Sequence, residues 1–323
     1  MEDVSVYHPS NLLYAQEPLS RYRQGGCHPV TLGDAFDDGR YTVLHKLGWG
    51  SYSTVWLARD KRGNRWVALK IMSAESTEKS REICNLLALS NSSQEGLAAH
   101  YIVQLLDEFT HDGPNGTHEC LVFELLGPTV AFIVEEFHAT SEKLEPEVIL
   151  RMSGQLLQAT AFIHGARLVH GDINSRNIAF TSGSLSRCAS EESLFKIIGS
   201  PKIEPLARID GAPLRPGLPK ELVKAVEWDN WIDEDEENIR LLGFSQTFTQ
   251  GAEPERIDQP SDLKAPETIF TDRFDYRLDL WRVGFAIYFF VFGVMPFQYT
   301  FGVDSDLVDQ MINFVEDLPA EWE

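Results

Sequence analysis

The sequence predicts an α+β protein with two lobes, in which a small antiparallel β lobe precedes a larger and mainly helical lobe. Between residues 40 and 72, three runs of β-branched and aromatic residues alternate with turns that contain glycine or charged residues, a pattern typical of antiparallel strands. Beyond Gly127 the apolar residues recur at helical spacing. With 323 residues, 43% of them hydrophobic, the chain is long enough to bury a large core.

The β lobe, residues 40–126, is expected to hold five strands and one helix. Alternating or continuous apolar runs predict strands at 41–48, 53–60, 65–72, 101–109 and 120–127. Apolar residues at helical spacing predict a helix over 75–89. Residues 1–39 are rich in Pro, Gly and Tyr with little periodicity, so they are expected to form an irregular extension packed on the fold.

The helical lobe, residues 127–323, is expected to contain a helix that starts at Pro146 and another that includes Val283–Phe297. The second run is continuously apolar, but it is shorter than the span of a bilayer and follows Asp279 and Arg282, so a buried helix is favoured over a membrane span. Residues 181–238 form a less regular insert, expected to be a surface excursion.

The formal net charge of −21 disfavours binding to nucleic acid or to anionic membranes and favours a basic partner. The acidic run at 233–237 is expected to be a solvated loop, with a binding role as the alternative. The four cysteines include no CxxC pair, and the N-terminus lacks the pattern of a signal peptide. These features favour a reducing location, the cytoplasm or the nucleus, and no membrane association.

A glycine-containing turn joins the first two predicted strands of the β lobe. Two glycines would allow the backbone to close over a triphosphate with its N–H groups facing the oxygens. Because a glycine-rich hairpin is often only a turn, this feature is weak alone. The candidate nucleotide-binding residues here are Leu47, Gly48, Trp49, Gly50, Ser51, Tyr52, Ser53, Thr54 and Val55.

Lys70 lies on the third predicted strand, within the segment VALK. In this context it is a candidate for pairing with the α and β phosphates, and the glycine turn upstream strengthens that interpretation. Glu82, on the following predicted helix, could hold the Lys70 ammonium in place. Glu78 is a competitor for that role, and either glutamate could instead form a solvated surface pair.

The segment HGDINSRN at 170–177 carries the most specific signal, because an aspartate and an asparagine are spaced as in a phosphotransferase catalytic loop. Asp172 would accept the proton of a substrate hydroxyl, and Asn177 would bind magnesium. Gly171 occupies the position of an arginine that usually pairs with a phosphate on the activation loop. Phosphorylation of that loop should therefore not activate the protein. Asn174 replaces a common lysine, and Arg176 could restore a positive charge near the γ-phosphate or be merely exposed.

Downstream, KAPE at 264–267 matches an anchor segment of such folds, and Asp279 could accept backbone N–H bonds from the catalytic loop. The motifs GRY at 39–41, LGWGSYSTVWLARD, VALKI, LVFELLGP, HGDINSRN and QPSDLKAPE together resemble the serine/arginine-protein kinases, particularly divergent fungal members. The resemblance implies a bilobal protein-kinase fold, Ser/Thr phosphorylation of Arg/Ser-rich proteins, ATP as cofactor, and nucleotide contacts at Ala68, Glu124 and Leu126.

Three departures from the family pattern bear on activity. Gly243 stands where the family has the aspartate that holds magnesium, so magnesium binding is expected to be weak or absent. The adenine floor is Ala179 instead of a bulky aliphatic residue. The chain stops soon after the apolar helix, so the α lobe is expected to be truncated and Glu267 to lack its usual arginine.

Two hypotheses therefore stand. The first is an ATP-dependent Ser/Thr kinase, expected to be monomeric, in which Lys70, Glu82, Asp172 and Arg176 serve catalysis and Asn177 is the remaining metal ligand. The second is a pseudokinase that keeps the fold as a nucleotide- or protein-binding scaffold. A small-molecule kinase is disfavoured, because KAPE belongs to a peptide-binding surface.

Overall fold

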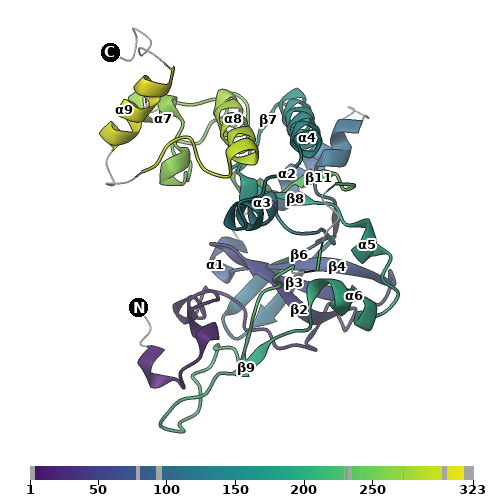
Figure 1. Ribbon diagram of the computed structural model, residues 1–323. Coiled ribbons are helices and arrows are strands. Elements are labelled where there is room, and N and C mark those ends of the chain that lie inside the picture. The colour runs from purple at the N-terminus through teal and green to yellow at the C-terminus, as the bar shows by residue number, and fades with distance from the viewer. Residues whose placement is uncertain are drawn as a thin grey trace. The chain divides into compact units, whose positions relative to one another are not determined.

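A computed structural model of the chain describes residues 4–77, 81–91, 97–228, 230–231, 235–271, 273–299 and 304–315. The chain divides into two compact units (Figure 1). The sheet unit comprises Met1–Ser80, Gln104–Gly127 and Ser182–Asp233. The helical unit comprises Arg81–Val103, Pro128–Thr181 and Glu234–Glu323.

The sheet unit is built on a six-stranded antiparallel sheet with the order β1-β2-β3-β4-β6-β5. Its strands are β1 (Ala35–Phe36), β2 (Tyr41–Trp49), β3 (Ser53–Asp60), β4 (Arg65–Met72), β5 (Leu105–Gly113) and β6 (Gly116–Glu124). Trp56, Leu69 and Val122 are among the buried residues of its core. The strands expected at 41–48, 53–60 and 65–72 are confirmed to within a residue. The strands expected at 101–109 and 120–127 are present with shifted bounds, because β5 begins and ends four residues later and β6 begins four and ends three residues earlier.

The N-terminal extension has short 3-10 helices, and it packs against strands of the insert. These helices are η1 (Val4–Val6), η2 (Asn11–Leu13) and η3 (Leu19–Arg21), and the strands are β9 (Ile203–Pro205) and β10 (Glu221–Val223). Leu12, Leu19 and Tyr22 share one hydrophobic cluster with Leu218 and Leu222. The extension therefore belongs to the core of the sheet unit.

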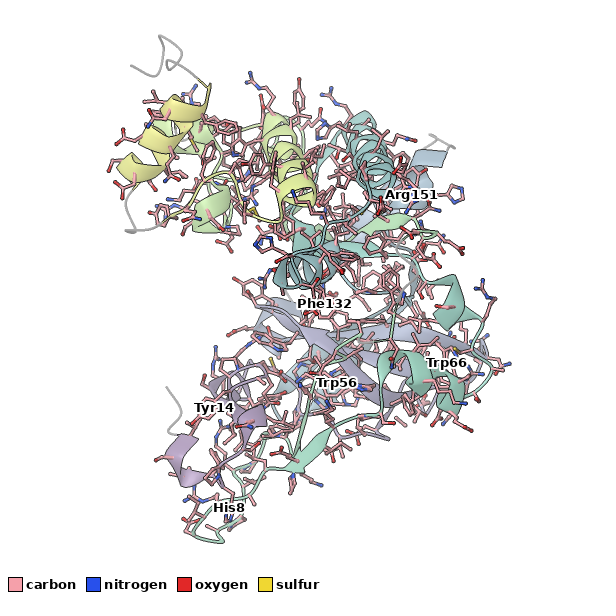
Figure 2. The ribbon with its side chains drawn as sticks, viewed as in Figure 1. His8, Tyr14, Trp56, Trp66, Phe132 and Arg151 are labelled. Carbon is pink, nitrogen blue, oxygen red and sulfur yellow. The ribbon has the colours of Figure 1, made fainter. Side chains whose placement is uncertain are left out.

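The insert also contributes α5 (Gly183–Ser186) and α6 (Glu191–Ile198) to the sheet unit. The Trp66 indole N–H on β4 donates to the Cys188 carbonyl at 2.7 Å, which fixes this segment to the sheet. Figure 2 shows Trp66 and Trp56 on this unit. The expected boundaries placed 181–238 in the C-terminal lobe as a surface excursion. The structure differs, because the insert belongs to the sheet unit, where Leu206, Leu218 and Leu222 are buried in one cluster with the N-terminal extension.

The helical unit is built mainly of helices, with two pairs of short strands. Its helices are α2 (Glu82–Ser90), α3 (Val130–Ala139), α4 (Pro146–Gly165), α7 (Pro266–Phe270), α8 (Arg277–Phe292) and α9 (Asp304–Val315). Short strands pair as β7 (Leu168–Val169) with β12 (Phe248–Thr249), and β8 (Ile178–Phe180) with β11 (Ile239–Leu241). The 3-10 turns are η4 (Leu97–Tyr101), η5 (Ser175–Asn177), η6 (Phe244–Gln246) and η7 (Ser261–Leu263).

One expected helix is confirmed, one is shorter than expected, and one is divided. Helix α4 begins at Pro146, whose missing N–H costs nothing in the first turn of a helix. The helix expected to include Val283–Phe297 is shorter than expected, because α8 ends at Phe292 and Gly293 caps it in the left-handed conformation. None of the helices among the described residues is long and apolar enough to cross a membrane. The helix expected over 75–89 is instead α1 (Ala74–Thr77) and α2, and Glu78 lies outside the described residues.

Candidate active site

The glycine turn of the sheet unit joins β2 to β3. The Gly50 N–H donates to the Ser53 carbonyl at 3.0 Å, and the Ser73 N–H donates to the Tyr52 carbonyl at 2.8 Å. A Cβ placed at Gly48 would meet nothing within 4 Å. The turn thus has an ordered backbone beside open space, which is what close approach of a ligand to the main chain requires.

Lys70, Ala68 and Val55 lie on one face of the sheet. Val55 on β3 is directly opposite Lys70 on β4, and Ala68 is two residues before Lys70 on the same strand. All three are half-buried, whereas Val67 and Leu69 on the other face are buried. The predicted roof of a nucleotide site and the predicted phosphate-binding lysine therefore share one surface of the sheet unit.

Glu124 and Leu126 lie at the C-terminal end of strand β6 of the same sheet. Glu124 is the last residue of β6, and its carboxylate accepts the Gln104 N–H at 3.0 Å. Leu126 is half-buried just past the strand. At Gly127 a Cβ would lie 3.2 Å from the Trp231 indole, so the insert packs closely against this connection. Sequence reasoning missed Trp231, because nothing in the local sequence places it here.

In the helical unit the predicted catalytic loop, residues 170–177, is held by Asp279, near the start of α8. Its carboxylate accepts the backbone N–H groups of His170 at 2.8 Å and Gly171 at 2.9 Å, and the His164 ring N–H at 2.9 Å. The first two bonds are those expected from the sequence. Gly171 has φ +80°, and a Cβ there would lie 2.6 Å from the Gln246 carbonyl oxygen, so a side chain at this position would be both strained and crowded.

Two asparagines orient the Asp172 carboxylate. The Asn177 side-chain amide donates to Asp172 Oδ2 at 2.7 Å and to the Asp172 carbonyl at 2.8 Å. The Asn174 amide donates to Asp172 Oδ1 at 3.1 Å, while its own oxygen accepts the N–H groups of Arg176 and Asn177. Asn174 thus caps η5 and fixes the loop through hydrogen bonds.

The surroundings of Asp172 act on its protonation in opposite directions. Burial raises the pKa of the Asp172 carboxyl, while Arg282 and the two asparagine amides favour the charged form. Burial also lowers the pKa of His170. The neutral ring accepts the Asp172 N–H on Nδ1 and donates from Nε2 to the Leu242 carbonyl, so it links the catalytic loop to the end of β11.

Arg282 on α8 is a residue that sequence reasoning did not assign to the site. Its side chain is fully buried, and Nη1 lies 3.8 Å from Asp172 Oδ1. Among the residues that the structure describes, Arg282 Nε and Nη1 have no hydrogen-bond acceptor. A positive charge with spare donors therefore faces the candidate catalytic base. Its position after a DLW segment carries no local signal for this role.

Arg176 and Glu82 have different environments. Arg176 is 80% exposed and pairs with Glu135 on α3 at 3.5 Å. Glu82 is buried near the start of α2, whose Asn85 donates to the carbonyls of Phe244 and Thr247 at 3.0 and 3.2 Å. Helix α2 is thereby tied to η6. The pairing of Glu82 with Lys70 stays a prediction.

Gly243 lies between β11 and η6 in the left-handed conformation, with φ 79°. A Cβ at this position would come within 2.9 Å of the Asn177 side-chain amide, so Gly243 and the candidate metal ligand are neighbours. Ala179 on β8 is buried and pairs with Arg240 of β11. No cluster of three or more His, Cys, Asp or Glu suited to a metal ion occurs within the described ranges.

The acidic run is only partly described, because Asp233 and Glu234 lie outside the described residues. Asp235 and Glu236 are exposed, and the Glu237 carboxylate accepts the Thr181 hydroxyl. Arg151 of α4, labelled in Figure 2, donates to the Asp235 carbonyl at 2.7 Å. The end of the run is therefore fixed to the helical unit.

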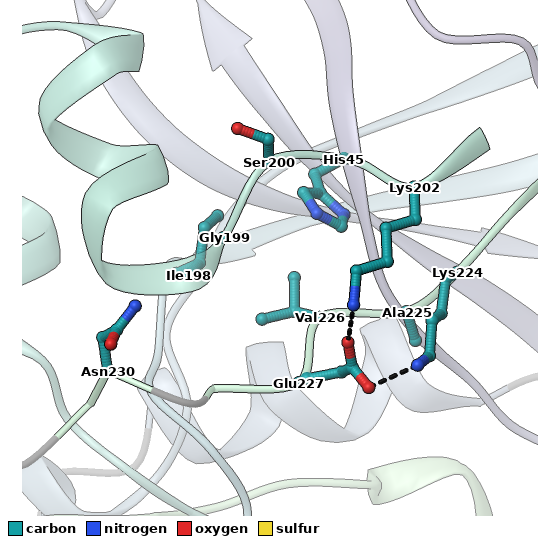
Figure 3. A pocket seen from close by; sticks show the side chains of 10 residues that line it. All are labelled: His45, Ile198, Gly199, Ser200, Lys202, Lys224, Ala225, Val226, Glu227 and Asn230. Atoms are coloured by element: carbon teal, nitrogen blue, oxygen red, sulfur yellow. Dashed lines mark hydrogen bonds and ion pairs between the residues drawn. The ribbon is translucent and has the colours of Figure 1, made fainter.

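A pocket in the sheet unit contains none of the predicted site residues. It is lined by His45 on β2 and by insert residues such as Lys202, Lys224 and Asn230 (Figure 3). Glu227 pairs with both lysines, at 2.6 Å with Lys202 and also with Lys224, so one carboxylate is shared by the two ammonium groups. The pocket offers no reactive arrangement.

The comparisons with known proteins agree with this geometry. Residues 41–197 match the protein kinase domain family. The chain is 35% identical over 177 residues to the serine/threonine-protein kinase SKY1 of Saccharomyces cerevisiae, covering 53% of this chain and 24% of that protein. It is 35% identical over 193 residues to human SRSF protein kinase 3, covering 58% and 33%.

The chain is similar to serine/threonine-protein kinases that include an SRSF protein kinase. A serine/threonine-protein kinase SRPK of Physarum polycephalum matches over 94% of this chain and 72% of its own length, at 28% identity. The kinase fold is also found in the crystal structure of a kinase domain with a TM-score of 0.59 and 18% identity, covering 84% of this chain and 69% of that one. The aligned part is about a quarter or less of the first yeast and nematode relatives.

Proposed function

We propose that the chain is an ATP-dependent protein kinase that transfers the γ-phosphate to Ser or Thr. The observation that carries this proposal is the geometry of the predicted catalytic loop. Asn174 and Asn177 orient Asp172, and Asp279 fixes the loop by accepting two of its backbone N–H groups. The similarity to known kinases supports it, since these relatives carry the name serine/threonine-protein kinase. The chain aligns with only part of those relatives, so the proposed activity rests on the geometry of its own site.

In the proposed reaction the hydroxyl oxygen of the substrate attacks the γ-phosphorus, and the bond from phosphorus to the ADP oxygen breaks. Asp172 accepts the hydroxyl proton, for which it must be ionised. Lys70 and the backbone N–H groups of residues 47–55 are assigned to the phosphates, with Glu82 orienting Lys70. Arg176 is assigned only a supporting role, because its guanidinium is exposed and already pairs with Glu135.

The residues on the magnesium side fit the ion poorly. Magnesium prefers carboxylate and phosphate oxygens, and in kinases it neutralises the charge that develops on the phosphates. Asn177 offers one neutral oxygen, since its amide nitrogen is committed to Asp172, and Gly243 offers no side chain. We therefore infer weak magnesium binding. ATP affinity should change little when magnesium is removed.

A basic protein substrate rich in Arg and Ser is the proposed partner. The net charge of −21 supports it, as does the name of the human relative, an SRSF protein kinase. Exposed Asp235 and Glu236 are candidates for this contact, with a solvated loop as the alternative. We further infer that the protein acts as a monomer in the cytoplasm or nucleus and binds no nucleic acid directly.

A second candidate function, a pseudokinase scaffold, is favoured by Gly243 alone. The segment around Gly243 keeps its tertiary hydrogen bonds, through Asn85 and His170, while lacking the carboxylate. Such a chain could bind nucleotide or protein partners without transferring phosphate.

A phosphotransfer assay separates the two functions. The full chain is incubated with labelled ATP and an Arg/Ser-rich peptide, beside Asp172→Asn, which keeps the shape of the side chain but cannot accept the proton. The kinase proposal expects transfer by the wild type and a loss of about a thousandfold in the variant. Equal, background-level incorporation in both proteins, with retained peptide binding, would establish the scaffold.

A further inference from the structure

The side chain of Arg21, in the N-terminal extension, is hydrogen-bonded to the tip of the glycine turn. Its guanidinium Nη1 donates to the Gly50 carbonyl at 2.6 Å, and Nη2 donates to the Ser51 carbonyl at 2.5 Å. Both acceptors are backbone atoms of successive peptide units. A planar guanidinium with two parallel donors suits such a pair of acceptors, and a lysine ammonium cannot reproduce this geometry.

The backbone that carries Arg21 is itself fixed. The Arg21 carbonyl accepts the Cys27 N–H at 2.8 Å. A Cβ at Gly26 would lie 1.9 Å from that carbonyl oxygen, so only glycine permits this close approach. The next residue, Tyr22, is buried, and its carbonyl accepts a bond from Arg215 at 2.5 Å. The guanidinium is therefore presented from an ordered support.

The same segment also holds the strand that leads into the turn. Glu17 and Lys46, of strand β2, form a buried ion pair with one Nζ to Oε1 distance of 2.7 Å, and the Tyr22 hydroxyl donates to Glu17. Residues 17–27 thus fix both β2 and the turn beyond it. Among these contacts, the bonds from Arg21 are the ones that reach Gly50 and Ser51 themselves.

Holding a carbonyl also sets the direction of the N–H in the same peptide unit. In a planar trans peptide the C=O and the following N–H point in opposite directions. The bonds to Gly50 and Ser51 therefore direct the N–H groups of peptides 50–51 and 51–52 away from Arg21. The Tyr52 carbonyl is held in turn by the Ser73 N–H. Fixed N–H groups bind an anion without a cost of reorganisation at the moment of binding.

We propose that Arg21 is a positioning residue for phosphate binding, which orders the glycine turn so that its N–H groups are set for the phosphates of a nucleotide. The identity of the ligand rests on the proposed function, whereas the ordering of the turn does not. The competing explanation is a surface arginine that satisfies two exposed carbonyls and changes nothing else.

Hydrogen exchange on the nucleotide-free full chain tests the ordering. Arg21→Met keeps the aliphatic stem and removes the donors. Its matched control is Arg23→Met, in the same segment, which loses an exposed pair with Glu75 at 3.0 Å and a bond to the neighbouring Gln24 carbonyl at 2.9 Å, neither of which reaches the glycine turn. In Arg21→Met the amides of residues 50–53 should exchange about tenfold faster. Unchanged exchange there, or equal acceleration in the control, overturns the proposal.

Affinities for ADP and adenosine, measured without magnesium, test the role in phosphate binding. Arg21→Met should weaken ADP about tenfold and leave adenosine unchanged, with partial recovery in Arg21→Lys. Equal weakening of both ligands, or of neither, overturns the assignment to phosphates. If the wild type bound neither ligand, the proposed function and the phosphate assignment would fail together, and hydrogen exchange would still decide whether Arg21 orders the turn.

Discussion

In the sheet unit the buried ion pair of Glu17 and Lys46 is fully partnered, whereas the helical unit keeps buried charge with unsatisfied atoms. Both Glu17 oxygens contact Lys46 Nζ, and the Tyr22 hydroxyl adds a further bond. In the helical unit Arg282 Nε and Nη1 and Glu267 Oε1 lack hydrogen-bond partners among the described residues. Buried charge is therefore held in different ways at these places in the molecule.

The difference separates structural charge from charge placed beside chemistry. A buried ion pair whose atoms all have hydrogen-bond partners fixes the local geometry. Here the pair of Glu17 and Lys46 fixes the strand that leads into the glycine turn. A buried charge that is incompletely satisfied is found at functional sites more often than elsewhere, and Arg282 faces Asp172 at 3.8 Å. Near the same loop, Gly243 lacks a charge where the family has one. Changing these charges one at a time should therefore affect stability in one unit and catalysis in the other.

The largest effect is expected from Lys46→Met, which leaves the Glu17 carboxylate buried without its partner. The free energy of unfolding should fall by about 3–5 kcal/mol. Urea denaturation measures it, with Arg23→Met, in an exposed pair, as a control that changes by less than about 1 kcal/mol. The double variant Glu17→Leu with Lys46→Met should recover most of the loss. A loss no greater than that of the control would remove the contrast between the units.

Gly243→Asp adds the missing carboxylate to the helical unit. Aspartate adopts the left-handed conformation more readily than most residues, but its Cβ must displace the Asn177 amide. We expect magnesium-dependent ATP binding and a rise in turnover of about a hundredfold, at a stability cost of about 1 kcal/mol. Gly243→Asn introduces the same crowding without the charge. It should therefore lose stability without gaining magnesium binding or turnover. If both variants behave alike, the carboxylate is not what limits the reaction.

The parts of the molecule that could be predicted from sequence are those whose signals are local. The catalytic loop, its N–H bonds to Asp279 and the strands β2 to β4 follow from short motifs and alternating side chains. The placement of the insert could not be predicted, because it depends on contacts such as Trp66 with Cys188, which are 122 residues apart. Arg21 and Arg282 were missed for the same reason, since each acts through a partner distant in sequence.

Arg282→Met removes the positive charge that favours ionised Asp172. The pKa of Asp172, already raised by burial, should rise further, so the acidic limb of the pH–rate profile should move to higher pH. Activity in that limb should fall by about tenfold or more and converge with the wild type at alkaline pH. Arg277→Met, an exposed arginine on the same helix, is the control. Arg282→Lys should retain the wild-type limb, and a uniform loss at every pH in Arg282→Met would indicate a purely structural role.

The smallest effect is expected from Glu267→Gln. Burial raises the pKa of Glu267, and one carboxylate oxygen has no partner within the described residues. A carboxyl whose pKa is higher in the folded state takes up its proton more readily there. In acid, where Glu267 is protonated in both states, it does not lower the free energy of unfolding. As the pH rises from the unfolded pKa of about 4.5 through the folded value, the charged form increasingly destabilises the folded protein.

Glutamine removes this penalty, so at pH 7 the variant should be more stable by about 1 kcal/mol, a rise of about 2 °C in Tm. At pH 4 the two proteins should melt together. Glu255→Gln, at an exposed position of the same unit, should change Tm at neither pH. A gain that is equal at both pH values would show that the unpaired charge is not its source, and the contrast between the two units would then rest on Arg282 alone.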